Sequence, residues 1–176
     1  FFIKWKVRNI FLKLDRELNR PHRVAVTLNN IGMEYFRLGR YDQALSYLQE
    51  ALAIERKLDN PHNIAARLNN IGATLVNNGK TQEAAEQFKA AIAADPNFAE
   101  AYYQLGMCLS GKPDTMPDAI KALQKYVEIA SEYLDGDLAF YAGKRLFHVI
   151  LDDLGKIKLQ SRNCCQFFLH DGYQLI

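Results

Sequence analysis

Apolar side chains recur along the chain at intervals of three and four residues, in segments separated by short polar breaks. In the first segment, residues 2–18, they are Ile3, Val7, Ile10, Phe11, Leu14 and Leu18. This spacing places them on one face of an α-helix. The same pattern predicts helices over residues 22–38, 41–58, 61–78, 81–94, 98–110, 117–133 and 137–154. The sequence therefore predicts an all-α protein.

Glycine, proline and asparagine mark the breaks between these segments. Gly39 and Gly79 follow two of the predicted helices, where a left-handed residue would end each helix. Asn60 precedes Pro61, which is the order expected for an N-cap and a first-turn proline. Thr81 is the predicted N-cap of the next helix. Short connections of this kind favour antiparallel neighbouring helices.

One short string occurs twice and reveals an internal repeat. Residues 28–32 and 68–72 both read Leu-Asn-Asn-Ile-Gly, 40 positions apart, and a weaker copy at residues 102–106 follows 34 positions later. A repeat of 20 to 50 residues indicates a solenoid, in which each unit buries its apolar face only against its neighbours. The sequence therefore predicts stacked helix pairs.

Glycine recurs inside the first helix of each pair, where it costs roughly 0.5–1 kcal/mol relative to alanine. We attribute this to a close approach of the two helices of a pair, so that an added side chain should cost about 1–3 kcal/mol. The glycines are Gly32, Gly72 and Gly106, and the alanines expected to face them are Ala44, Ala84 and Ala119. Larger residues expected to fill the space between pairs are Tyr35, Leu75, Leu109, Leu48, Phe88 and Leu123.

Taken together, these positions resemble the tetratricopeptide repeat (TPR) family. The matched positions are Leu28, Ile31, Gly32, Tyr35, Ala44, Leu48 and Ala51, then Leu68, Ile71, Gly72, Leu75, Ala84, Phe88, Ala91 and Pro96, then Tyr102, Leu105, Gly106, Leu109, Ala119 and Leu123. The third repeat departs from the pattern where Tyr126 replaces the second alanine. The 40-residue spacing is similar to the longer-helix subtype found in kinesin light chain and in bacterial peptide-sensing regulators.

The resemblance implies a right-handed α-solenoid of antiparallel helix pairs, with an extra helix at each end. We expect a repeat domain over residues 1–155 and a separate apolar segment over residues 156–176, whose structure the sequence leaves open. The expected parts are a partial repeat at 2–18, repeats at 22–58, 61–94 and 98–133, and a closing helix at 137–154.

In this family the first helix of each pair lines a concave surface that usually binds peptides. By resemblance, Asn30 and Asn70 would contact the backbone of a ligand, and Gln104 takes their place in the third repeat. An amide suits this contact because it offers two donors and an acceptor. The alternative is that these amides bond to a neighbouring helix or loop. The full candidate set is Asn29, Asn30, Met33, Arg37, Arg67, Asn69, Asn70, Asn77, Tyr103, Gln104 and Met107.

The character of this candidate surface follows from its side chains. Methionines suit an adaptable binding surface. Arg37, Arg67 and Arg23 would make it mildly basic and favour an acidic or carboxylate-ended ligand, unless they pair with local glutamates. The chaperone-binding members of the family hold a terminal carboxylate with lysine and arginine at set positions. Those positions are largely apolar or amide here, so this ligand is not favoured.

Composition restricts the remaining function classes. A net charge of +2 gives no support for bulk nucleic-acid binding. Three cysteines do not form a disulfide framework, which favours a reducing compartment and, we expect, the cytoplasm. No apolar run approaches the ~20 residues of a membrane span. Because the chain begins without methionine, we expect it to be part of a longer protein whose upstream targeting is open.

Signals for an enzyme are poor. His22 and His62 are one repeat apart, which is too far to share a metal, and His148 with Asp152 is most simply a surface pair. The chain contains no glycine-rich phosphate loop and no hydrolase or metalloprotease motif. We therefore expect no catalytic activity, cofactor or metal.

The hypothesis that follows is a protein–protein interaction scaffold that binds a peptide segment or partner helix. Two alternatives stay open. The apolar segment from Gln160 onward could drive self-association or fill the chain's own groove, or the repeats could be the sensor part of a larger regulator.

Overall fold

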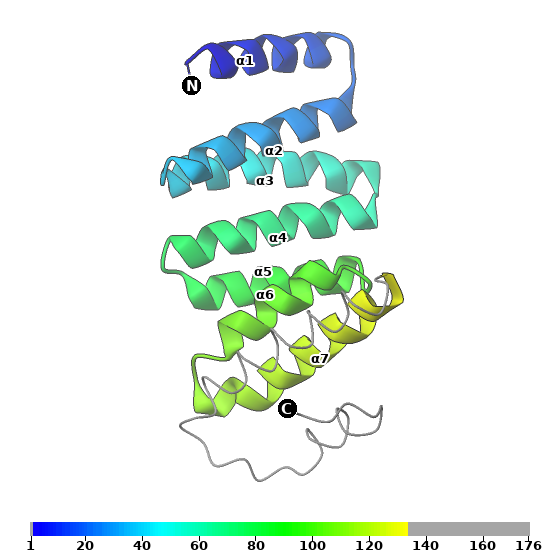
Figure 1. Cartoon of the computed structure of the whole chain (residues 1–176). Helices are drawn as coiled ribbons and strands as arrows, with labels where there is room; N and C mark the ends of the chain where they lie inside the picture. Colours follow the sequence, from blue (N-terminus) through cyan, green and yellow to red (C-terminus); the bar gives the residue numbers. More distant parts are fainter. Residues whose placement is uncertain (1, 134–176) are drawn as a thin grey trace, which may run out of the picture. The chain divides into compact units, whose positions relative to one another are not determined.

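A computed structural model describes residues 2–133 of the 176-residue chain. The closing helix expected at residues 137–154 and the segment 156–176 lie outside the described residues. The described part consists of helices, with no strand among them (Figure 1). They are α1 (Phe2–Glu17), α2 (Pro21–Arg37), α3 (Tyr41–Leu58), α4 (Pro61–Asn77), α5 (Thr81–Ala94), α6 (Ala99–Leu109), the 3₁₀ turn η1 (Pro113–Thr115) and α7 (Met116–Tyr133).

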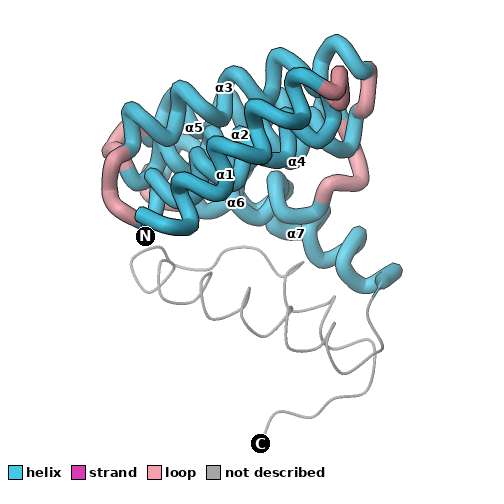
Figure 2. Tube along the Cα trace, turned by 90° about the horizontal axis from the view of Figure 1, so that it is seen from above, coloured by secondary structure: helices cyan, strands magenta, loops and turns pink. Residues whose placement is uncertain are grey.

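Residues 21–133 form three helix pairs, α2/α3, α4/α5 and α6/α7, which follow one another as an all-α solenoid (Figure 1). Successive pairs join through contacts of α3 with α4 and of α5 with α6, and α1 packs against α2. The first helices of the pairs also contact one another, α2 with α4 and α4 with α6. Seen from above, these helices are linked by short loops (Figure 2).

For the helices that the structure describes, the predicted ends agree with the observed ends to within one residue. Two of the left-handed ends are glycines, with φ of +69° at Gly39 and +76° at Gly79, as predicted. After α2, Gly39 N donates to Phe36 O and Arg40 N donates to Tyr35 O, both at 2.9 Å. This pair of bonds is a Schellman motif, and it supplies donors to carbonyls at the helix end that have no partner within the helix.

One predicted cap is confirmed and one is wrong. Asn60 caps α4, because its side-chain oxygen accepts from Asn63 N at 3.0 Å. Thr81 does not cap α5 but is its first residue, and Lys80 holds the N-cap position without a side-chain bond. The reason is the tight turn after Gly79. Lys80 N still closes the previous helix on Leu75 O at 2.9 Å, while Lys80 O already accepts from Ala84 N at 3.0 Å.

The predicted close approach within each pair is confirmed. A Cβ added to Gly72 would lie 2.5 Å from Phe88 Cε1, and one added to Gly106 would lie 2.5 Å from Leu123 Cγ. At Gly32 the nearest atom is Leu48 Cγ, at 2.9 Å. The larger side chains of the second helices therefore lie against the glycine of their own pair, and not only in the space between pairs as predicted.

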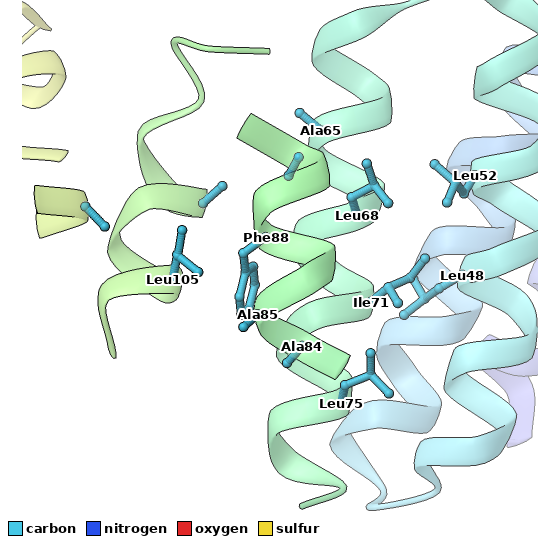
Figure 3. Close-up of a cluster of buried hydrophobic side chains, with 13 residues drawn as sticks. Leu48, Leu52, Ala65, Leu68, Ile71, Leu75, Ala84, Ala85, Phe88 and Leu105 are labelled. Carbon is cyan, nitrogen blue, oxygen red and sulfur yellow. The ribbon is translucent and has the colours of Figure 1, made fainter. Parts of the chain in front are cut away.

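The core runs through the stack as two clusters of buried side chains. The larger one spans α3 to α7 and is centred on Phe88, which is fully buried (Figure 3). It brings together Leu48 of α3, Leu68 and Ile71 of α4 and Leu105 of α6. The smaller cluster joins Leu12, Val24, Ala25, Leu28, Ile31 and Ala51 of α1 to α3. The clusters hold the first helices in fixed register, which positions the candidate residues.

Candidate functional site

All the candidate residues lie on the first helices, α2, α4 and α6, which touch one another in turn. We call their solvent-facing surface the first-helix face. Each of the three first helices contributes an exposed apolar side chain to this face. Val26, Val76 and Met107 are each 36–38 % exposed, and Met33 and Tyr103 are half-buried. Tyr103 also packs against Tyr126 of α7, with ring centroids 5.3 Å apart.

The paired asparagines of the repeat fall into two different environments. Asn29 is only 9 % exposed and its Oδ1 accepts a hydrogen bond of 2.8 Å from Asn70 Nδ2. This bond joins α2 to α4, so Asn70 makes the contact with a neighbouring helix that the sequence left open. It uses one of the two amide hydrogens of Asn70 and fixes which end of that amide points at Asn29.

Asn30 lies in a different environment, although it directly follows Asn29 in α2. Its side chain is exposed, and its backbone carbonyl accepts from Arg8 Nη1 of α1 at 3.3 Å. The two repeat-equivalent residues, Asn30 and Asn70, are therefore not equivalent in the folded chain. The difference arises because α2 is the first of the three first helices, while Asn70 has α2 beside it.

The next junction, between α4 and α6, has an asparagine and a glutamine at these positions and lacks the equivalent bond. Asn69 and Gln104 are the repeat equivalents of Asn29 and Asn70, and both are half-buried. Asn69 Oδ1 is buried and makes no hydrogen bond within the described residues. An unsatisfied buried acceptor of this kind costs about 1–3 kcal/mol.

The arginines of the candidate set are compensated by acidic neighbours. Arg37 donates to Glu34 at 2.8 Å, and Arg23 Nε lies 3.1 Å from Asp15 Oδ1. The Arg37–Glu34 pair is the local glutamate pairing that the sequence held as the alternative to a basic surface, whereas Arg23 pairs with an aspartate. Nearby, Asn77 is exposed, and its side-chain amide donates to Ala73 O of the preceding turn at 2.9 Å.

Arg67 does not supply charge to the surface as the sequence suggested. Its side chain is buried, and Nη2 lies 3.5 Å from Oε1 of the fully buried Glu55. Burial lowers the pKa of Arg67, and the neighbouring Glu55 carboxylate opposes that shift. The physical reason is that a guanidinium inside the stack needs a nearby carboxylate to offset lost hydration.

Sequence reasoning missed a set of acidic residues at the junctions between pairs. Glu55 lies 3.3 Å from His22 Nδ1 and accepts from Asn63 Nδ2 at 3.2 Å. Asp95 lies 2.9 Å from His62 Nδ1 in the next junction. The signal was present, because Asp15, Glu55 and Asp95 recur every 40 residues near the end of a second helix. These contacts tie each second helix to the start of the next pair.

Within residues 2–133, no three histidine, cysteine or acidic side chains gather closely enough to hold a metal ion. None of the helices described is long and apolar enough to cross a membrane.

Comparison with known proteins identifies the repeat. Two sequence models described as tetratricopeptide repeat match residues 23–97 and 70–133, which together exceed half of the chain. The chain belongs to the tetratricopeptide repeat family. No curated protein sequence matches it. The matched residues extend over the three helix pairs described above, and α1 precedes them.

Two solved TPR structures share this fold. One is the first TPR of Spaghetti (RPAP3) bound to the HSP90 peptide SRMEEVD, with a TM-score of 0.56 and 20% identity, covering 71% of this chain and 89% of that one. The other is the Sgt2 TPR domain from Aspergillus fumigatus, with a TM-score of 0.51 and 23% identity, covering 70% of this chain and 79% of that one. Such likeness establishes the fold.

Proposed function

We propose that this TPR chain is a protein-interaction scaffold whose first-helix face binds a peptide segment or partner helix. The observation that carries the proposal is a pair of amides on neighbouring helices. Asn30 of α2 is exposed, and Asn70 of α4 is held by its hydrogen bond to Asn29 of α2. An amide fixed in one orientation presents a defined donor and acceptor pattern to a ligand backbone. Fixing it before binding lowers the entropy lost when the ligand is captured.

Apolar side chains on the same helices complete the proposed site. Val26, Val76 and Met107 expose more than a third of their surface, whereas the other large apolar side chains of the first helices are buried or half-buried. Peptide recognition commonly combines backbone hydrogen bonds with pockets for alternate side chains. The ligand we propose therefore carries apolar side chains and offers its backbone to Asn30 and Asn70.

The charges on this face favour an internal peptide segment over a chain end. Arg37 and Arg23 pair with Glu34 and Asp15, and Arg67 is buried against Glu55. In the described structure each arginine of the candidate set thus has an acidic partner with which a terminal carboxylate would compete. The RPAP3 domain was solved with SRMEEVD, so this peptide is a useful comparison. We expect it to bind this chain at least about tenfold more weakly than a selected internal peptide.

The test begins with peptides selected from a displayed random library against the full chain. The best peptide is then measured by calorimetry against Asn30→Ala, because the Asn30 side chain is exposed. We expect affinity to fall about tenfold, or ~1.4 kcal/mol, at an unchanged melting temperature. Gln49→Ala, an exposed amide on α3, is the matched control and should bind as the parent does.

An Asn30→Ala variant that keeps full affinity would remove Asn30 from the proposal. Asn70→Ala is less clean, because it also breaks the bond to Asn29 that joins α2 to α4. We further propose that the repeat domain extends over residues 1–155. The alternatives of self-association through the segment from Gln160 and of a sensor role stay predictions, because they concern residues outside the described structure or outside the chain.

A further inference from the structure

The end of α4 carries the chain's only asparagine that is followed by glycine, Asn78 before Gly79. Asn78 is the C-cap of α4, and Gly79 follows it in the left-handed conformation, with φ of +76°. The backbone nitrogen that follows an asparagine can attack the side-chain amide, and a side chain on the attacking residue hinders this reaction. Gly79 has no side chain, whereas isoleucine follows Asn30 and Asn70. The sequence thus marks Asn78 as the asparagine most prone to the reaction.

The structure leaves room for this reaction. Gly79 is exposed, and a Cβ added to it would meet nothing within 4 Å. The half-buried Asn78 side chain donates from Nδ2 to Oδ1 of Asp42, in the first turn of α3, at 3.4 Å. This distance is long for a hydrogen bond, so the contact holds the amide weakly. The amide carbon can therefore turn toward the Gly79 nitrogen.

The turn after α4 restrains the attacking nitrogen. Gly79 N donates to Val76 O at 3.0 Å, and Lys80 N donates to Leu75 O at 2.9 Å. The Gly79 nitrogen must leave its bond before it can attack. Helix ends open locally at a smaller free-energy cost than the opening of a buried core element. We therefore expect the native chain to react more slowly than the unfolded chain, but without full protection.

We propose that Asn78 is a site of spontaneous deamidation. The Gly79 nitrogen bonds to Cγ of Asn78, the bond from Cγ to Nδ2 breaks, and the proton of the Gly79 nitrogen leaves with the departing ammonia. A cyclic imide then joins the two residues. Water opens this imide at either carbonyl, which gives aspartate in one case and isoaspartate, with its β-carbon in the main chain, in the other. The net reaction consumes one water and releases one ammonia.

Both products weaken the contact between α3 and α4, which joins the first helix pair to the second. Each product replaces a donor to Asp42 by a carboxylate, so that two negative charges face each other. The new charge also lies at the C-terminal end of α4, where the helix dipole disfavours it. Isoaspartate in addition lengthens the main chain just before Gly79 and disturbs the bonds of the turn. This inference does not rest on the peptide site, and the two proposals can fail separately.

Incubation of the full chain at mildly alkaline pH, followed by tryptic digestion and mass spectrometry, tests the proposal. The tryptic peptide of residues 68–80 contains Asn78 together with Asn69, Asn70 and Asn77, which serve as internal references. We expect Asn78 to convert several-fold faster than each of these in the native chain, and to give aspartyl and isoaspartyl peptides that separate in chromatography. Asn78→Gln should stay intact, because its cyclisation needs a larger ring. Conversion of Asn78 only in guanidinium chloride would overturn the proposal.

Urea unfolding of variants tests the structural consequence. Asn78→Asp should lower the unfolding midpoint, and Asp42→Asn in that background should restore part of the loss. Asn77→Asp is the matched control, because it adds the same charge at the same helix end, while the Asn77 side chain bonds to Ala73 O within α4. It should lower the midpoint less and recover nothing with Asp42→Asn. Equal losses for the two variants, or no recovery, would overturn the assigned effect on the contact with Asp42.

Discussion

The close approach of α4 and α5 makes a sharp prediction for Gly72→Ala. An alanine Cβ at this position would lie 2.5 Å from Phe88 Cε1 and 2.7 Å from Phe88 Cζ. Both distances are far inside van der Waals contact, and Phe88 is fully buried, so its ring has little room to move. The added methyl group must therefore displace the ring or push the two helices apart.

The magnitude follows from two opposing effects. Overpacking of a buried site costs about 1–3 kcal/mol. Replacing glycine by alanine inside a helix returns roughly 0.5–1 kcal/mol. Because the clash is severe, we expect the first effect to win and Gly72→Ala to lower the free energy of unfolding by about 1–2 kcal/mol.

The assay is urea unfolding followed by circular dichroism at matched m-values, with two further variants. Gly111→Ala is the control, because an added Cβ there meets nothing within 4 Å. It should change stability by less than about 0.5 kcal/mol. Phe88→Ala removes the clashing ring atoms, so Gly72→Ala should cost less in that background. Equal costs in both backgrounds, or a stabilised Gly72→Ala, would refute the steric explanation.

Three further outcomes follow from single contacts. Asn60→Ala removes the N-cap of α4 and should lower the free energy of unfolding by about 1 kcal/mol, measured by urea titration. Glu55→Ala leaves Arg67 buried without its carboxylate and should cost about 3 kcal/mol in the same assay, while adding Arg67→Met should recover part of that loss. Burial raises the pKa of the Cys108 thiol, so less thiolate is present at pH 8, and mass spectrometry should show slower alkylation of Cys108 in the native chain than in urea.

The helices and their order could be predicted from the sequence because local signals mark them. Apolar spacing fixed the faces, and Gly39 and Gly79 marked two ends through their left-handed backbone. The cap of α5 could not be predicted, because it depends on how tightly the chain turns after Gly79. A shift of one residue moved the cap from Thr81 to Lys80.

The candidate site could be predicted only to the level of helices. Asn29 and Asn30 are adjacent and therefore about 100° apart on α2, and the packing of α4 decides which of them meets Asn70. The burial of Arg67 likewise depends on Glu55, which lies on another helix. Local periodicity contains no information about such contacts between pairs.

The central claim is that the first helices form the ligand surface, and NMR with a selected peptide tests it most directly. The backbone amide signals of the ¹⁵N-labelled full chain are recorded as the peptide is added. We expect the largest shift changes on α2, α4 and α6, including the side-chain amides of Asn30 and Asn70. Changes centred on α1, α3 or α5, with these amides unmoved, would contradict the account.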